Sequence, residues 1–231
     1  MPEARISFFL RRMERDKPQY TRAEEIWNAS THAAGAAFSI AAIAVMVTLA
    51  SVYASAWAIV SCAIFGVSML FVYSASSFYH AIPYERAKRV LKKIDHIAIY
   101  YLIAGSYTPF LLVSLRMDSP VTAWIVFGII WTLAILGTVL KLCLSGAGTK
   151  WWSIALYLAM GWLVVLVSGK LFSAVPVSGI VFLALGGLFY TGGVFFYLRK
   201  RRKYSHAVWH VFVLLGTVMH FFSVLFSCVF V

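Results

Sequence analysis

The segment Asn28–Tyr53 reads NASTHAAGAAFSIAAIAVMVTLASVY and contains no Asp, Glu, Lys or Arg. A helix needs about 20 such residues to cross about 30 Å of hydrocarbon, so this segment is long enough to span a membrane. Six further apolar segments follow, of which the fifth in the chain is the shortest. Their approximate bounds are Trp57–Tyr79, Ile94–Leu115, Val121–Leu140, Trp151–Ser168, Val177–Leu198 and His206–Val231. The sequence therefore predicts seven membrane-spanning segments.

The overall composition agrees with an integral membrane protein. Of 231 residues, 62% are hydrophobic and only 12% are charged, unlike a water-soluble domain. The segment lengths and the Leu, Ala, Gly and Phe content favour helices over the alternating strands of a barrel. The predicted fold is an all-α, seven-transmembrane helix bundle in the plasma membrane. Residues 1–25 form a basic N-terminal tail, a candidate amphipathic surface helix, and residues 26–231 form the transmembrane domain.

The basic residues are unevenly distributed between the two ends of the predicted spans. The net charge is +12, yet all Lys and Arg except Arg116 and Lys170 lie in the N-terminal tail or in the alternate loops on the same side. Such a bias places the N-terminus in the cytoplasm and the C-terminus outside. It favours contact between the basic loops and anionic lipid headgroups, and it makes nucleic acid an unsuitable partner.

Polar residues gather at the cytoplasmic ends of four predicted spans. His80 closes the second span, Asp95 opens the third, and His206 and His210 open the seventh. Residues four apart lie about 40° apart around a helix, so His206 and His210 point the same way. In the first span, a polar stripe recurs at helical spacing. Its members are Glu25, Asn28 and His32. Ionisable groups inside a membrane are costly, so this layer is a candidate functional site.

Three imidazoles and a carboxylate at one depth are suited to zinc, which takes nitrogen ligands and keeps a water at catalytic sites. We predict that His80, His206 and His210 bind Zn²⁺. Asp95 would then hydrogen-bond the water on the metal, and Ser76, one turn before His80, would position that water.

Each of these assignments has a structural alternative. Ser76 could bond to a carbonyl of its own helix, and Asp95 could cap the third helix or pair with Lys92 or Lys93. His96 points about 100° away from Asp95, which favours a packing role. His220 lies ten residues past His210, about 15 Å deeper, and we assign it a structural role. For the span-one stripe, both structural support of the site and direct contact with substrate stay open.

Several ordered motifs together resemble the hemolysin III family, the bacterial branch of the progestin and adipoQ receptor superfamily. The matching stretches are Glu25-x-x-Asn28-x-x-x-His32, Ser76-x-x-x-His80, His80-Ala-Ile-Pro-Tyr-Glu-Arg-Ala-Lys, Lys93-Ile-Asp-His-Ile-Ala-Ile-Tyr-Tyr, Gly105-Ser-Tyr-Thr-Pro-Phe, Leu158-Ala-Met-Gly-Trp162 and His206-x-x-x-His210. The resemblance covers nearly the whole chain beyond the tail. It implies a seven-helix bundle with cytoplasmic-side zinc on His80, His206 and His210, and an aspartate, here Asp95, near the metal-bound water.

Three classes of function stay open at this point. The superfamily includes alkaline ceramidases, so the resemblance implies a zinc-dependent hydrolase of lipid amides or esters, with Asp95 as the base. A second class is a receptor or membrane-homeostasis factor with structural zinc. The third is a pore-forming cytolysin, which an all-apolar bundle fits poorly. In every case membrane lipids are the expected partners.

Overall fold

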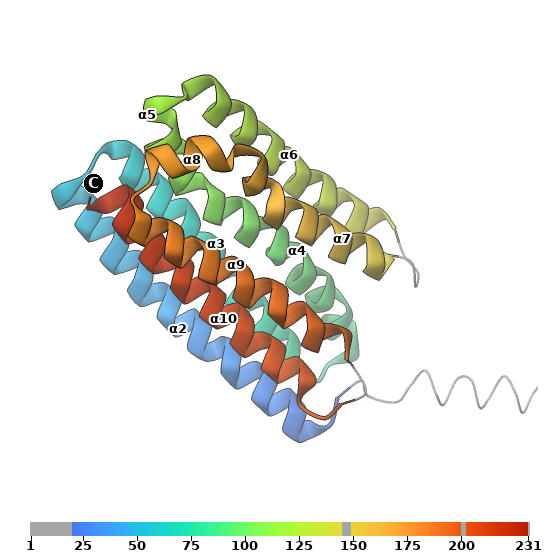
Figure 1. The fold of residues 1–231 in the computed structure, drawn as a ribbon. Helices are drawn as coiled ribbons and strands as arrows, with labels where there is room; N and C mark the ends of the chain where they lie inside the picture. Colours follow the sequence, from blue (N-terminus) through green and yellow to red (C-terminus); the bar gives the residue numbers. More distant parts are fainter. Residues whose placement is uncertain (1–19, 145–148, 200–201, 231) are drawn as a thin grey trace, which may run out of the picture.

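The computed structural model describes residues 20–144, 149–199 and 202–230, and every regular element within them is helical. Seven helices in these residues are long and apolar enough to cross a membrane. They lie side by side in one bundle (Figure 1). The predicted all-α, seven-span architecture of a multi-pass membrane protein is therefore confirmed. The proposed surface helix of the tail falls on residues 1–19, outside the described part.

Four spans are single α-helices and three combine several pieces. The single helices are α2 (Arg22–Tyr53), α3 (Ala56–Ala81), α6 (Pro120–Cys143) and α9 (Val177–Leu198). The third span joins α4 (Glu85–Pro109), a π-helical stretch (Phe110–Leu115) and α5 (Arg116–Asp118). The fifth joins α7 (Thr149–Trp162), a 3₁₀ turn (Leu163–Val167) and α8 (Ser168–Ala174). The seventh is α10 (Ser205–Val224) with a π-helical end (Leu225–Val229).

The first span begins earlier than its apolar segment, because polar residues cap the helix. Thr21 is the N-cap: its hydroxyl accepts a hydrogen bond from the backbone N–H of Glu24, whose carboxylate accepts one from the N–H of Thr21. This reciprocal capping box satisfies donors that a helix start leaves free. Glu25 takes no part in the cap and is available for other contacts.

The third span also begins earlier than predicted. Helix α4 starts at Glu85, so Asp95 lies ten residues inside the helix rather than at its opening. The N-cap position belongs to Tyr84, which excludes the capping alternative for Asp95. The physical reason is that Lys and Arg are good helix formers, so the basic segment before Ile94 continues the helix instead of forming a loop.

The fifth span is the least regular of the seven, and its predicted end at Ser168 was wrong. The helical path continues to Ala174, but a 3₁₀ turn interrupts it at Leu163–Val167. The interrupted segment contains no proline and no charged residue, so the sequence gives no sign of a helix break there. Its cause lies on a neighbouring helix: the N–H of Val164 donates to the hydroxyl of Tyr107 on α4.

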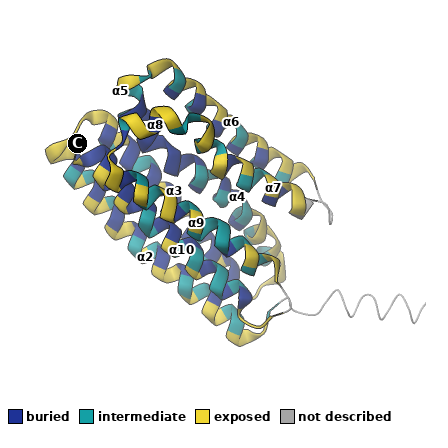
Figure 2. Ribbon diagram, in the orientation of Figure 1, coloured by how far each residue is buried: buried dark blue, intermediate teal, exposed yellow. Residues whose placement is uncertain are grey.

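Helices α3, α4 and α10 are the most buried, and α2, α6, α7 and α9 have more exposed residues. Large apolar side chains such as Ile40, Ile125 and Leu188 are exposed. Exposed residues, in yellow, occur on the outward-facing sides of the helices (Figure 2). Exposed apolar surface is expected where lipid is the solvent.

Small residues let the helices approach closely. Gly186 and Gly193 of α9 serve this purpose, because a Cβ atom there would overlap His220 and Trp209, respectively. Gly187 does not, because a Cβ atom added to it would meet nothing within 4 Å. It faces a cavity instead.

The start of α2 and the C-terminus lie at opposite ends of the bundle (Figure 1). An odd number of crossings requires this arrangement. Most of the described basic residues lie at the end where α2, α4 and α10 begin. By the positive-inside rule, we predict that this end faces the cytoplasm.

Candidate metal centre

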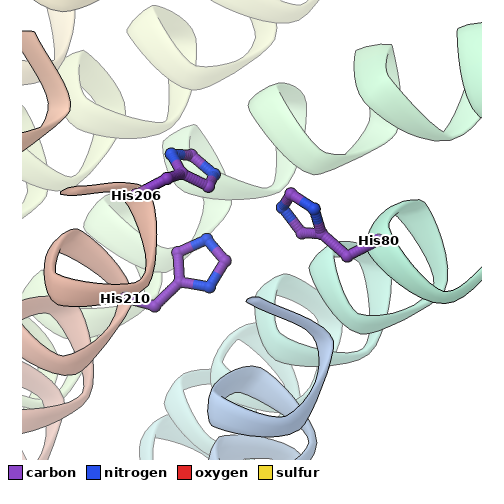
Figure 3. Close-up of side chains that lie close together, drawn as sticks. All are labelled: His80, His206 and His210. Atoms are coloured by element: carbon purple, nitrogen blue, oxygen red, sulfur yellow. The ribbon is translucent and has the colours of Figure 1, made fainter. Parts of the chain in front are cut away.

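Three histidines from two helices converge at the end of the bundle where α2 begins. His80 lies at the last turn of α3, and His206 and His210 lie on successive turns at the start of α10. Their rings point toward one another (Figure 3), with centroid separations of 5.1 Å for His80–His206, 5.2 Å for His80–His210 and 4.5 Å for His206–His210. One nitrogen from each ring lies within 4.8 Å of the other two.

Glu25 of α2 fixes the orientation of the His80 ring. Nδ1 of His80 lies 2.6 Å from Oε2 of Glu25, and Oε1 of Glu25 accepts a hydrogen bond of 2.6 Å from Nζ of Lys88. Nε2 of His80 is buried and has no hydrogen-bond partner among the described residues. A carboxylate on one ring nitrogen leaves the other as a basic lone pair, which is how proteins prepare a histidine to bind a metal.

His210 is oriented in a similar way, by backbone rather than by carboxylate. Its Nδ1 donates to the carbonyl oxygen of Asn28 at 3.1 Å, and Oγ1 of Thr31 lies 3.2 Å from the same nitrogen. The ring is fully buried. With Nδ1 occupied, Nε2 is the nitrogen that remains for a ligand bond.

The start of α10 is held in place by contacts with α2 and α9. Tyr204, just before the helix, has a left-handed backbone conformation (φ 59°), and its N–H donates to Oε1 of Glu24 at 3.1 Å. The Ser205 hydroxyl donates to the Phe196 carbonyl of α9. Because a non-glycine residue adopts this conformation only when its surroundings enforce it, these bonds set where His206 enters the cluster.

Tyr20, which precedes α2, packs against the cluster. Its ring stacks on His206 at 5.1 Å and meets the edge of His80 at 5.7 Å. Burial raises the pKa of the Tyr20 hydroxyl well above its usual value, so the group is a neutral phenol. Tyr20 thus adds an uncharged aromatic ring to the packing around the histidines.

A cavity of about 440 Å³ begins at the cluster and runs into the bundle. Asp95, Ser76, His206 and His210 all line it, together with many apolar side chains from α4, α7, α8 and α9. The Asp95 carboxylate is not among the ligand atoms that lie within 4.8 Å of one another. Ser76 is buried and its hydroxyl has no partner among the described residues, so it does not bond to its own helix.

The other members of the span-one stripe lie beside His210. The ring of His32 stacks on that of His210 with centroids 3.5 Å apart, and its two nitrogens have no hydrogen-bond partner in the described part of the chain. The same is true of the side-chain amide of Asn28, whose backbone carbonyl holds His210. The stripe therefore contacts the histidine cluster along one side, from α2.

The two remaining histidines lie outside the cluster. Nδ1 of His96 donates to the Lys92 carbonyl at 2.6 Å and lies 3.7 Å from Oδ2 of Asp95, so His96 is nearer to that carboxylate than its helical position suggested. It lines the cavity. His220 packs deep in the bundle, edge-on to Tyr190 at 5.2 Å and against Gly186, and does not reach the other histidines.

Sequence reasoning missed Tyr20 and Lys88 as contributors to the site, and it placed Glu24 among the polar residues that open the first span without giving it a separate role. Tyr20 precedes the first helix. Lys88 belongs to a basic segment whose charge is already accounted for by the positive-inside bias, so the sequence gives it no separate role. Glu24 differs from Glu25 by a single position, and only the capping box signals its separate role.

The residues of the cluster suit a zinc ion. Three imidazoles are a donor set that zinc prefers, and the buried Nε2 of His80 has no other partner among the described residues. Ligand atoms on one tetrahedral zinc, each at about 2.0–2.1 Å, lie about 3.3 Å apart, so these three rings are within reach of a common ion.

Comparisons with known proteins identify close relatives of the chain. A family model described as Haemolysin-III related matches residues 20–221, which include every residue of the centre. The Hemolysin-3 homolog of Bacillus subtilis (strain 168) is 43% identical over 210 residues, 91% of this chain and 97% of that protein. Hemolysin-3 of Bacillus cereus is 41% identical over 203 residues, which are 88% of this chain and 91% of that protein. The Monocyte to macrophage differentiation factor of Homo sapiens is 28% identical over 174 residues, which are 73% of this chain and 70% of that protein.

Proposed function

The chain belongs to the hemolysin III family, and on that premise we propose that it is a zinc-dependent hydrolase of membrane lipids that contain an amide or ester bond. The observation that carries the proposal is the position of the three histidines. They lie together beside a largely apolar cavity that His206 and His210 line, and the rings of His80 and His210 are oriented by bonds through Nδ1.

His80, His206 and His210 are the residues that would hold the metal. When bound, zinc would acidify a water molecule and polarise a carbonyl oxygen. Glu25 keeps the His80 ring in the tautomer that leaves Nε2 free, and the Asn28 carbonyl does the same for His210. These partners fix the rings before any ligand arrives, which favours catalysis because little reorganisation remains.

Asp95 and Ser76 are the groups proposed to act on the substrate. Asp95 would accept a proton from the attacking water and later return it to the leaving amine or alcohol. Ser76 has a buried hydroxyl without a partner among the described residues, so its O–H is free to bond the substrate or the water. Both line the cavity that also reaches His206 and His210.

The substrate class follows from the size and lining of the cavity. About 440 Å³ lies within the usual range of ligand sites, and most of the lining side chains are apolar. A lipid would occupy this space with its chain and present its amide or ester at the polar end. Turnover of such lipids would give the protein a role in membrane lipid or fluidity homeostasis, and its basic loops would contact anionic headgroups.

A second candidate function is a receptor or homeostasis factor in which the zinc is structural. One observation favours it: the cluster joins α3 to α10, and Glu25 adds α2, so a bound ion would tie three helices together. The relatives named Hemolysin-3 raise a cytolytic function as well, but a bundle with apolar side chains over its outer surface suits a resident of the membrane.

The test is an assay of the purified protein in liposomes against long-chain amides and esters, before and after zinc removal by a chelator. We expect hydrolysis that is lost with the metal and returns when zinc is restored. Full zinc occupancy without hydrolysis of any of these lipids would contradict the enzymatic function and favour the structural one.

A further inference from the structure

The two histidines of the cluster that lie on α10 are stacked on rings from the start of the first span. The ring of His32 lies against that of His210, with centroids 3.5 Å apart and planes 17° apart. The ring of Tyr20 lies against that of His206 in the same manner, at 5.1 Å and 25°. The described rings that contact His80 meet it at 56° or more, and a carboxylate orients that histidine instead.

The hydrogen bond to the Asn28 carbonyl does not by itself fix the plane of the His210 ring. A bond of 3.1 Å along the Nδ1–H direction sets where that nitrogen points, but it does little to stop the ring from turning about the bond. His32 covers one face of the ring and opposes this rotation. Together the two contacts determine where Nε2 points, and Nε2 is the nitrogen that remains for a ligand.

The ring of His32 is itself held by a neighbouring helix. It is buried, and it meets the ring of Tyr73 of α3 edge-on at 5.1 Å. The Tyr73 hydroxyl donates to Oγ1 of Thr217 at 2.6 Å. Thr217 follows His210 on α10 by seven residues, about two turns along the same face of the helix. These contacts form a closed loop through α10, α2 and α3, so the ring of His32 is a firm support for that of His210.

The nitrogen atoms of His32 take no part in these contacts. Neither forms a hydrogen bond with a described residue, and neither belongs to the group of ligand atoms that lie within 4.8 Å of one another. Leaving buried polar atoms unbonded costs stability, so hydrogen bonding to the protein does not explain this side chain. The contacts that it does make are ring contacts.

We propose that His32 and Tyr20 are positioning residues of the metal centre, because each lies flat against one histidine of α10 and sets the plane of its ring. With the Glu25 carboxylate on His80, the segment 20–32 then orients all three histidines, although it supplies none of the three ligands. A metal withdraws electrons from an imidazole that binds it, and the face of a neighbouring aromatic ring attracts such an electron-poor group. This inference deepens the proposed function and rests on it for the metal, but it does not require hydrolysis.

The test is competition for zinc between the full-length protein in detergent and a chelator of known affinity, with three variants of His32. His32→Phe keeps an aromatic ring without nitrogen, His32→Asn keeps a polar nitrogen without the ring, and His32→Ala keeps neither. We expect His32→Phe to bind zinc nearly as the wild type does. The Asn and Ala variants should bind it about 10- to 100-fold more weakly, the usual effect of removing a residue that supports a metal ligand.

His220→Ala is the matched control, because His220 is also a buried histidine of the bundle but does not reach the cluster. It should bind zinc as the wild type does. The reverse order of the His32 variants, with zinc binding kept in Asn and lost in Phe, would overturn the proposal, since a nitrogen rather than the ring would then matter. Unchanged zinc binding in His32→Ala, or no zinc binding in the wild type, would overturn it as well.

The visible absorption of bound Co²⁺ separates positioning from stability, because it depends on the coordination geometry of the ion. We expect Tyr20→Ala and His32→Ala to change this spectrum, and Tyr20→Phe, which keeps the ring, to leave it as in the wild type. Tyr20 precedes the first helix, so its replacement leaves the packing of the spans intact. A variant that is only less stable would keep the wild-type spectrum for each ion bound. Wild-type spectra in both Ala variants would contradict the proposal.

The outcomes separate this inference from the proposed function. The expected order of zinc affinities in a protein that hydrolyses no lipid would keep the positioning role and reject the enzyme. Lipid hydrolysis by a wild type whose zinc affinity and Co²⁺ spectrum are unchanged in His32→Ala and Tyr20→Ala would keep the enzyme and reject the positioning role.

Discussion

Glu25 contacts His80 with one carboxylate oxygen and Lys88 with the other, both at 2.6 Å. The carboxylate therefore compensates the charge of Lys88 and orients the imidazole at the same time. Neither task is visible from the spacing Glu25-x-x-Asn28-x-x-x-His32, which shows only that the three side chains share one face of a helix. The partner of Glu25 lies on α3, and a spacing rule within one helix cannot identify a contact between two.

We predict that Glu25→Gln weakens zinc binding about 10- to 100-fold, because a neutral amide supports the His80 Nδ1–H less well than a carboxylate does. Competition with a chelator of known affinity measures the change. Glu85→Gln is the control, since Glu85 is exposed and pairs only loosely with Arg89 at 3.8 Å. Equal zinc affinity in Glu25→Gln and the wild type would show that the Glu25 contact does not support the metal.

The Asp95→Asn variant distinguishes a role of Asp95 in proton transfer from a purely structural role. The Asn side chain is nearly isosteric and can still form hydrogen bonds, but it cannot accept a proton as a carboxylate does, so we expect turnover of a lipid substrate to be abolished. Because Asp95 lies outside the group of close ligand atoms, most of the zinc should be retained. If the variant hydrolysed lipid as fast as the wild type, Asp95 would have no part in the mechanism.

At the scale of the helices, the sequence predicted the number and order of spans well, because the length of an apolar segment is enough to identify one. Helix ends were less predictable where side chains decide them, as at Thr21 and Glu85. The break in the fifth span could not be predicted, because its cause is the hydroxyl of Tyr107 on another helix.

Close contacts between helices give a prediction of their own. A Cβ atom on Gly35 of α2 would lie 2.6 Å from the ring of Tyr73, and that ring is held by a 2.6 Å bond from its hydroxyl to Thr217. We therefore expect Gly35→Ala to destabilise the bundle by about 1–3 kcal/mol through overpacking. Thermal unfolding in detergent measures the loss.

Gly128→Ala is the control for that loss, because nothing lies within 4 Å of its Cβ direction. It should leave the unfolding temperature unchanged or slightly raised. A Gly35→Ala variant as stable as Gly128→Ala would mean that Tyr73 can move away, and that the α2–α3 contact is looser than its geometry indicates.

At the scale of the whole molecule, the seven crossings and the basic end define an orientation. Reporter fusions at Lys203 and after Val231 should report opposite compartments, with Lys203 in the cytoplasm. The same compartment for both would contradict the topology. Opposite compartments with Lys203 outside would keep the fold but move the histidine cluster to the outer side of the membrane.

The zinc content of the purified protein tests the central claim most directly. Elemental analysis should find about one zinc per chain in the wild type and a sharp loss in His80→Ala, His206→Ala and His210→Ala, because each removes one of three ligands. His220→Ala should keep its zinc, since that ring does not reach the cluster. Full zinc in the His80 and His210 variants, or none in the wild type, would contradict the account.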